Sequence, residues 1–315
     1  MCAHRAPHHS ARYTSRFVRG RHPANYNHPG GAGSRSTGLW KLEMMSLIWL
    51  RVALVCYAAG LLYALVALTR TSEILSKVAL HASYLGMVFH LVSLTEAVVQ
   101  TGQLASVSVH NAESLLAFLI MVGFMLAYLV YKTTTPGIVV FPLVFLLTFV
   151  AASGQQPFVF TSVAVKNGWL AVHVLMIFTG YAALFLSFGA SILYLLQERA
   201  LKSKSKSGMF SRLPALQVID DIGYRSLMLG FPFMTLGLIA GSVVAVATYG
   251  RIDYFDPKIL LSLLMWAVYL LMVFTRLNAG WRGRRAAMLA SAAFATAIVA
   301  WLANYFSSMH RFVSS

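Results

Sequence analysis

Five histidines lie outside the first 43 residues, at His81, His90, His110, His173 and His310. Neutral imidazole is a common ligand for metal ions and for haem iron, so these side chains are the first candidates for a site. His173 opens one apolar run and His310 follows another, with four predicted membrane crossings between them. Both are therefore expected at the same membrane surface. A single interfacial histidine can also be an amphipathic anchor, so the residues alone leave both interpretations open.

Two further histidines share one predicted helix over residues 78–99. His81 and His90 are nine residues apart, which at 100° per residue places them on opposite faces. They cannot bind one ion together. His90 lies near the middle of the run and is predicted to be buried, whereas His81 lies near its end.

A polar connector, YGRIDYFDPK at residues 249–258, separates two strongly apolar runs. It holds four charged residues, Arg251, Asp253, Asp256 and Lys258, together with three aromatic rings. Two predicted crossings separate it from each of the two interfacial histidines, so it shares their surface. Flat aromatic rings over an apolar floor suit a porphyrin face. Asp256, directly before Pro257, is also a natural N-cap for the following helix.

The elements that position these residues are predicted membrane helices. Of 315 residues, 58% are hydrophobic and only 11% are charged, which requires the bilayer to solvate part of the surface. The fold class is therefore all-α, a polytopic integral membrane helix bundle with about eight transmembrane helices. The predicted spans are residues 46–69, 78–99, 113–131, 138–153, 169–196, 226–248, 259–275 and 286–306.

The basic residues set the predicted orientation. The net charge of +16 would suggest nucleic acid in a soluble protein, but here the cations lie between apolar runs, so no nucleic-acid partner is expected. Connectors 197–212 and 276–285 are rich in Lys and Arg and are predicted to be cytoplasmic, which places the C-terminus outside. Cys2 and Cys56 form no CxxC motif, so thiol redox chemistry has no support.

Residues 1–43 are rich in Arg, His, Ser, Gly and Pro, and are predicted to be a disordered basic tail before a membrane domain over residues 44–315. Such a composition is also typical of a transit peptide. Met44 or Met45 opens an ordinary first span, and we expect the natural start there, with the tail as an upstream over-extension.

Several segments, taken in order, resemble one family. They are HNAESLLAF, NGWLAVHVLMIFTGYAALFLSFGASILYLLQERALK, RLPALQVIDDIGYRSLMLGFPFMTLGLIAGSVVA, YGRIDYFDPK and RLNAGWRGRRAA. Together they resemble the CcsA/HemX cytochrome c assembly family from about residue 85 to the end. The resemblance implies a haem-handling protein of the bacterial cytoplasmic (inner) membrane, with haem b held at the outer face. It also implies a CcsB/ResB-type membrane subunit, apocytochrome c and membrane lipid as partners.

The resemblance assigns roles to particular residues. His173 and His310 match the two external histidines that bind the haem iron axially, and His90 matches a membrane-embedded histidine. The connector 249–258 occupies the place of a tryptophan-rich loop. The cofactor-binding residues implied are His173, His310, His90, Trp169, Tyr249, Gly250, Tyr254, Phe255 and Asp256. Catalysis by this chain is not implied, because the apocytochrome supplies the thiols, so the chain is at most a subunit of a haem-attachment system.

The chain also departs from the family pattern. Tyr249 and Phe255 stand where tryptophans are usual, and Asp253 stands where another is expected, with Arg251 as its obvious partner. Phe274 occupies the place of a second membrane histidine. These departures favour an alternative, a HemX-like scaffold or regulator without stable haem binding. A small-solute transporter is a third hypothesis, for which Glu96 is the main intramembrane acid.

Overall fold

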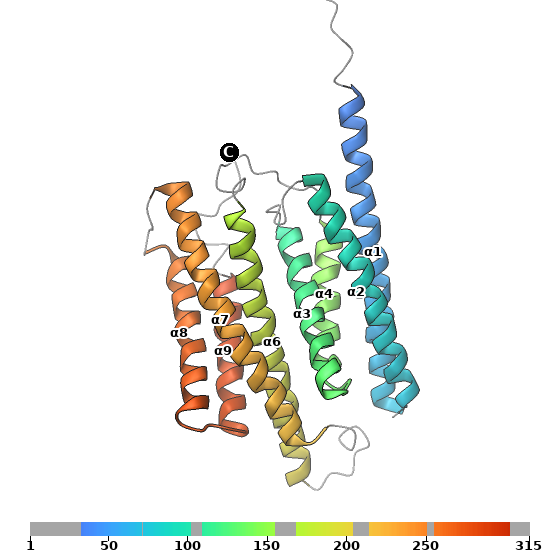
Figure 1. The fold of residues 1–315 in the computed structure, drawn as a ribbon. Coiled ribbons are helices and arrows are strands. Elements are labelled where there is room, and N and C mark those ends of the chain that lie inside the picture. Colours follow the sequence, from blue (N-terminus) through green and yellow to red (C-terminus); the bar gives the residue numbers. More distant parts are fainter. Residues whose placement is uncertain are drawn as a thin grey trace, which may run out of the picture.

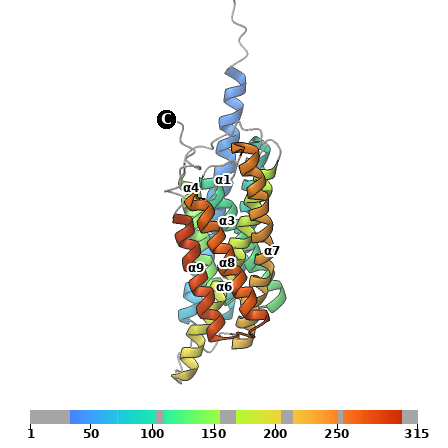
Figure 2. The same cartoon turned by 90° about the vertical axis from the view of Figure 1, so that its left-hand side faces the viewer.

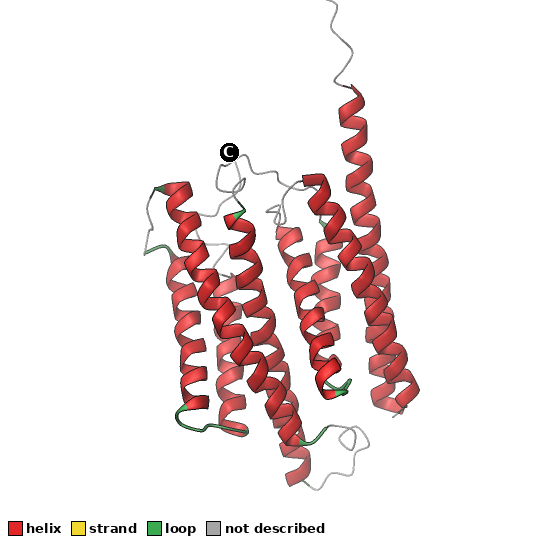
Figure 3. Cartoon of the chain, viewed as in Figure 1, coloured by secondary structure: helices red, strands yellow, loops and turns green. Residues whose placement is uncertain are grey.

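The computed structural model describes residues 33–70, 72–101, 109–154, 168–203, 214–250 and 255–302. Over these ranges the chain is helical and contains no strand (Figure 3). The helices are α1 (Gly33–Arg70), α2 (Glu73–Thr101), α3 (Val109–Tyr131), α4 (Gly137–Ser153), α6 (Trp169–Lys202), α7 (Leu216–Tyr249), α8 (Pro257–Leu277) and α9 (Arg284–Leu302). The predicted all-α membrane bundle is confirmed.

Six of the described helices are long and apolar enough to cross a bilayer, namely α1, α2, α3, α6, α7 and α8. The chain is therefore a multi-pass membrane protein. Helix α4 has 17 residues and contains Pro142. Its run was also the shortest predicted from the sequence. Helix α1 begins at Gly33, so residues 33–43, which we assigned to the basic tail, are helical, while residues 1–32 lie outside the described part of the chain.

The helices run up and down in two groups that lie side by side (Figures 1 and 2). Helices α1 to α4 form one group, in which α1 packs on α2 and α4. Helices α6 to α9 form the other, in which α6 packs on α7 and α9, and α8 packs on the same two. The two groups meet mainly where α3 packs on α6.

Small residues let α7 approach α6 closely. Gly223, Gly230 and Gly237 recur every seven residues on α7 and face α6. A Cβ atom at Gly237 would come 2.7 Å from Cδ1 of Ile177, and one at Gly230 would come 2.8 Å from Cβ of Ala183. The hydrophobic effect does not drive helix association inside lipid, so helices there associate through the close packing that small residues allow. The α7 backbone is therefore close enough for α6 side chains to reach its carbonyl groups.

The two ends of the bundle differ in their charged residues. The α1–α2, α3–α4, α6–α7 and α8–α9 connections all lie at one end (Figure 1). We call it the basic end because Arg70, Lys132, Arg199, Lys202, Arg276, Arg282, Arg284 and Arg285 lie there. The helix ends on either side of residues 102–108, 155–167 and 251–254 all lie at the opposite end. That the basic end faces the cytoplasm stays a prediction from the distribution of Lys and Arg.

Candidate functional site

His173 lies in the second turn of α6, at the end of the bundle opposite the basic end. Its Nδ1 atom lies 2.7 Å from the backbone oxygen of Gly237 on α7. A carbonyl oxygen can only accept, so Nδ1 carries the proton and the imidazole lone pair is on Nε2. Histidines that bind a metal through Nε2 commonly donate Nδ1–H to a carbonyl in this way. The half-buried His173 ring is therefore held in the tautomer that suits a ligand.

A second glycine of α7 makes room for this ring. A Cβ atom at Gly241 would come 2.6 Å from Cε1 of His173 and 2.7 Å from its Nδ1. Real Cβ atoms do not approach that closely, so only glycine accommodates the ring where it lies. The backbone of α7 thus provides both the acceptor at Gly237 and the surface against which the ring packs.

Two exposed aromatic side chains lie at the same end of the bundle. Trp169 is the first residue of α6 and is 48% exposed, and Phe255, next to the start of α8, is 86% exposed. Gly250 ends α7 in the left-handed conformation, with φ +71°, and donates its N–H to Val246 at 2.9 Å. An L side chain would strain the backbone there. The turn therefore requires this glycine.

Asp256 occupies the N-cap position of α8 that the sequence suggested. It directly precedes Pro257, the first residue of the helix, and its carbonyl oxygen accepts the Leu260 N–H at 3.0 Å. Its side chain is only 4% exposed. Asp256 therefore belongs to the structure of the α8 N-terminus, and it is Phe255 that faces outward.

Other predicted site residues fall outside the described part of the chain. His310, Tyr254, Arg251 and Asp253 lie there, and only the backbone of Tyr249 is described. The pairing of His173 with His310, and that of Arg251 with Asp253, thus stay predictions.

His90 lies elsewhere, enclosed by α1, α2 and α3. Its ring is fully buried, with Nε2 at 2.9 Å from the Ser114 hydroxyl and Nδ1 at 3.4 Å from the Tyr57 hydroxyl. The Phe118 ring meets it edge-on, with the ring centroids 5.7 Å apart. The predicted burial is confirmed. Both ring nitrogens are engaged by side chains, so an iron could bind His90 only by displacing Tyr57 or Ser114.

Neither of the other two candidate positions, His81 and Phe274, provides a second haem ligand beside His90. His81 is exposed and lies on another face of α2, where its Nδ1 is 2.6 Å from the Lys77 carbonyl oxygen. Phe274 is 56% exposed on α8, which packs in the other helix group. Within the described residues, no group of three or more His, Cys, Asp or Glu side chains could hold a metal ion.

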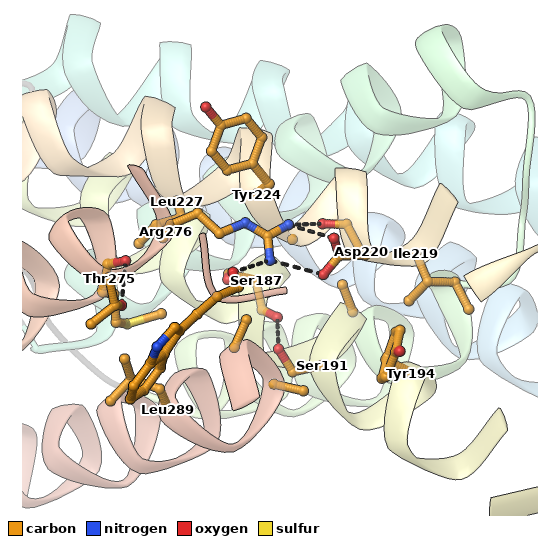
Figure 4. Close-up of a pocket in the computed structure, with 16 residues that line it drawn as sticks. Ser187, Ser191, Tyr194, Ile219, Asp220, Tyr224, Leu227, Thr275, Arg276 and Leu289 are labelled. Carbon is orange, nitrogen blue, oxygen red and sulfur yellow. Dashed lines mark hydrogen bonds and ion pairs between the residues drawn. The ribbon is translucent and has the colours of Figure 1, made fainter. Parts of the chain in front are cut away.

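A polar cluster at the basic end was not predicted from the sequence. Arg276 of α8 binds the Asp220 carboxylate of α7 through both guanidinium nitrogens, at 3.0 and 2.5 Å. Arg276 also donates to the Trp281 carbonyl oxygen at 3.0 Å, and its guanidinium carbon lies 5.1 Å from the centroid of the Tyr224 ring. Figure 4 shows the guanidinium directed at Asp220, in a small cavity lined by α6, α7, α8 and α9. This ion pair joins the C-terminal end of α8 to α7.

The adjacent acid, Asp221, makes its own contacts. Its carboxylate accepts the Tyr131 hydroxyl from α3 at 2.6 Å and pairs with Arg225 at 3.0 Å. Asp220 and Asp221 are two of only nine acids and stand together beside an apolar run, a signal that could have indicated partners. Together these acids connect α7 to α3 and α8.

Comparison with known proteins gives consistent results. Residues 78–312 match the family model described as cytochrome C assembly protein. A cytochrome c biogenesis protein CcsA of Prochlorococcus marinus (strain MIT 9312) is 32% identical over 158 residues, covering 44% of this chain and 51% of the relative. The protein of the same name from Guillardia theta is 30% identical over 196 residues, covering 56% of this chain and 64% of the relative.

A third protein of that name, from Chlamydomonas reinhardtii, is 33% identical over 138 residues, covering 44% of this chain and 37% of the relative. The chain thus spans about half the length of the curated relatives it matches. The family match itself covers most of the chain and includes all the described helices except α1 and the first five residues of α2. The chain belongs to the cytochrome c assembly protein family.

Proposed function

We propose that this chain is a membrane component of cytochrome c biogenesis that binds haem and presents it at the outer face of the membrane. Haem is the cargo in this proposal, and His173 with His310 are its axial ligands. The names of the relatives support the pathway, and the observation that carries the proposal is the hydrogen bond from His173 Nδ1 to Gly237. Because Nδ1 donates this bond, the lone pair through which a neutral imidazole binds haem iron is on Nε2.

The surroundings of His173 also fit a porphyrin. The ring stands against bare backbone at Gly241, so its orientation is fixed before any ligand arrives. Trp169 and Phe255 expose flat apolar rings at the same end of the bundle. In this proposal the chain's own residues bind and orient the haem, while the thiols of apocytochrome c provide the reactive groups. A CcsB/ResB-type subunit and the bacterial inner membrane complete the proposed setting.

An absorption spectrum tests the proposal. The full chain, purified in detergent and supplied with haem, is expected to show a Soret band. His173→Ala and His310→Ala should each abolish or shift that band, and added imidazole should restore it in part by replacing the missing ligand. His81→Ala is the matched control, because His81 is exposed and bonds only its own helix. Equal spectra for wild type and both ligand variants would refute the assignment of the ligands.

A second candidate function is a HemX-like scaffold or regulator that does not bind haem stably. Two observations favour it: Phe274 points outward where a second membrane histidine would be needed, and both His90 nitrogens already have partners. A wild-type protein that stays colourless after haem supplementation would support the scaffold and overturn the haem-binding proposal.

A further inference from the structure

The α8–α9 turn carries three arginines, Arg282, Arg284 and Arg285, and we propose that they form a binding site for the phosphate headgroup of an anionic phospholipid. The site lies at the basic end, away from His173, and does not depend on the proposed haem function.

The acids near this turn are already paired. Glu198 binds Lys202 at 2.7 Å, Asp220 binds Arg276 at 2.5 Å and Asp221 binds Arg225 at 3.0 Å. The sequence holds no other acid between residues 198 and 220, and none after residue 256. The carboxylates near the turn are therefore paired with cations other than its three arginines.

The three arginines of the turn are all exposed, and within the described residues none has an ion pair or a hydrogen bond from its side chain. The turn lies near the C-terminal half of α6, because Gly283 packs against Tyr194 of that helix. The cations Arg199 and Lys202 in that half add to the positive field. The turn is therefore a positively charged surface that would attract an anion from outside the chain.

The turn that carries the arginines is held in place on both sides. The Trp281 N–H donates to the Thr275 carbonyl at 3.1 Å, and the Gly283 N–H donates to Asp220 at 3.2 Å. Gly283 has φ +62° and lies against the Tyr194 ring, whose Cζ would be 3.1 Å from an added Cβ. Arg282 lies between these anchored residues. A pre-organised turn loses less conformational entropy when it binds a ligand.

The position of the turn favours a lipid over a soluble anion. It joins two helices whose exposed apolar side chains include Phe274 and Leu277 on α8 and Met288 on α9. A headgroup bound at the arginines would leave its acyl chains against this apolar surface. Trp281, which is half-buried in the turn, is the kind of residue enriched where a membrane meets water. Guanidinium groups bind phosphate oxygens in bidentate geometry, which suits a phosphodiester headgroup.

Lipid titration of the full chain in detergent tests the site. Phosphatidylglycerol is expected to raise the midpoint of thermal unfolding at lower concentration than phosphatidylcholine, and the dose dependence gives an apparent Kd. Arg282→Gln, Arg284→Gln and Arg285→Gln together should weaken phosphatidylglycerol binding on the order of 100-fold, and each alone about fivefold. The single variants serve if the triple variant does not fold.

The matched control removes the same charge from the same end. Arg70, Lys77 and Lys132 are exposed cations on the other helix group, and their triple substitution by Gln should leave the apparent Kd nearly unchanged. Equal weakening in both triple variants would show a diffuse basic field and overturn the site. Inorganic phosphate that competes as well as the lipid would show a site for a soluble anion, and wild-type affinity in the arginine variants would also refute the proposal.

Discussion

Replacing Gly241 by Ala tests whether α7 positions the His173 ring. The new Cβ would lie 2.6 Å from Cε1 of His173, so the ring must move by about 0.8 Å to reach the 3.4 Å of ordinary contact. Such a shift strains the 2.7 Å hydrogen bond to Gly237 that fixes the tautomer. Loss of a partner of this kind typically lowers the affinity of a metal ligand about 10- to 100-fold.

The change in stability should be small by comparison. Overpacking costs about 1–3 kcal/mol, and the alanine returns about 1 kcal/mol of helix propensity. The expected result is therefore a folded Gly241→Ala protein that binds haem about 10- to 100-fold more weakly, with a shifted Soret band.

The assay is a haem titration followed at the Soret band, with thermal unfolding measured in parallel. Gly223→Ala is the matched control, since it makes the same change on the same helix and its Cβ would meet Ala190 and Ser187 only at ordinary contact distances of 3.5 to 3.8 Å. A Gly241→Ala protein with wild-type affinity and an unchanged spectrum would refute the positioning by α7. Loss of affinity in both glycine variants would point to α7 packing in general.

Two further predictions concern buried polar groups. Asp220→Ala leaves the Arg276 side chain, which is only 8% exposed, without its carboxylate, and should lower the unfolding free energy by about 3–5 kcal/mol. Adding Arg276→Met removes the unpaired charge and should restore most of that stability. A double variant as unstable as Asp220→Ala alone would contradict this prediction. His90→Ala removes a fully buried ring and should lower the unfolding free energy by about 2–5 kcal/mol while the Soret band stays unchanged; a lost band would instead make His90 a haem ligand.

The helices were largely predictable from hydropathy, and the errors have a physical cause. The predicted span 226–248 became α7, which begins ten residues earlier, at Leu216. Hydropathy treats Asp220 and Asp221 as loop residues because it cannot register a partner such as Arg276, 56 residues further along the chain. Helix α4 has no acid or base, and its predicted start at residue 138 differs from the observed Gly137 by a single residue.

The candidate site was predictable only in part. The position of His90 in the middle of an apolar run was enough to predict its burial, because a polar side chain there is costly when it faces lipid. The contact of His173 with Gly237 joins residues 64 positions apart, and no single-sequence pattern specifies that pairing. The seven-residue spacing of Gly223, Gly230 and Gly237 does indicate a close helix contact, but it does not name the partner helix.

The ion pair between Asp220 and Arg276 has a consequence for the order of events during synthesis. The arginine is made 56 residues after the aspartate, which at about 5–20 residues per second is a delay of roughly 3–11 seconds. During that interval Asp220 has no Arg276 to bind, and a lone carboxylate is costly in hydrocarbon, so it has to stay in water. This cost favours keeping the start of α7 at the membrane surface until α8 has been made, when Arg276 can pair with Asp220 and join the two helices.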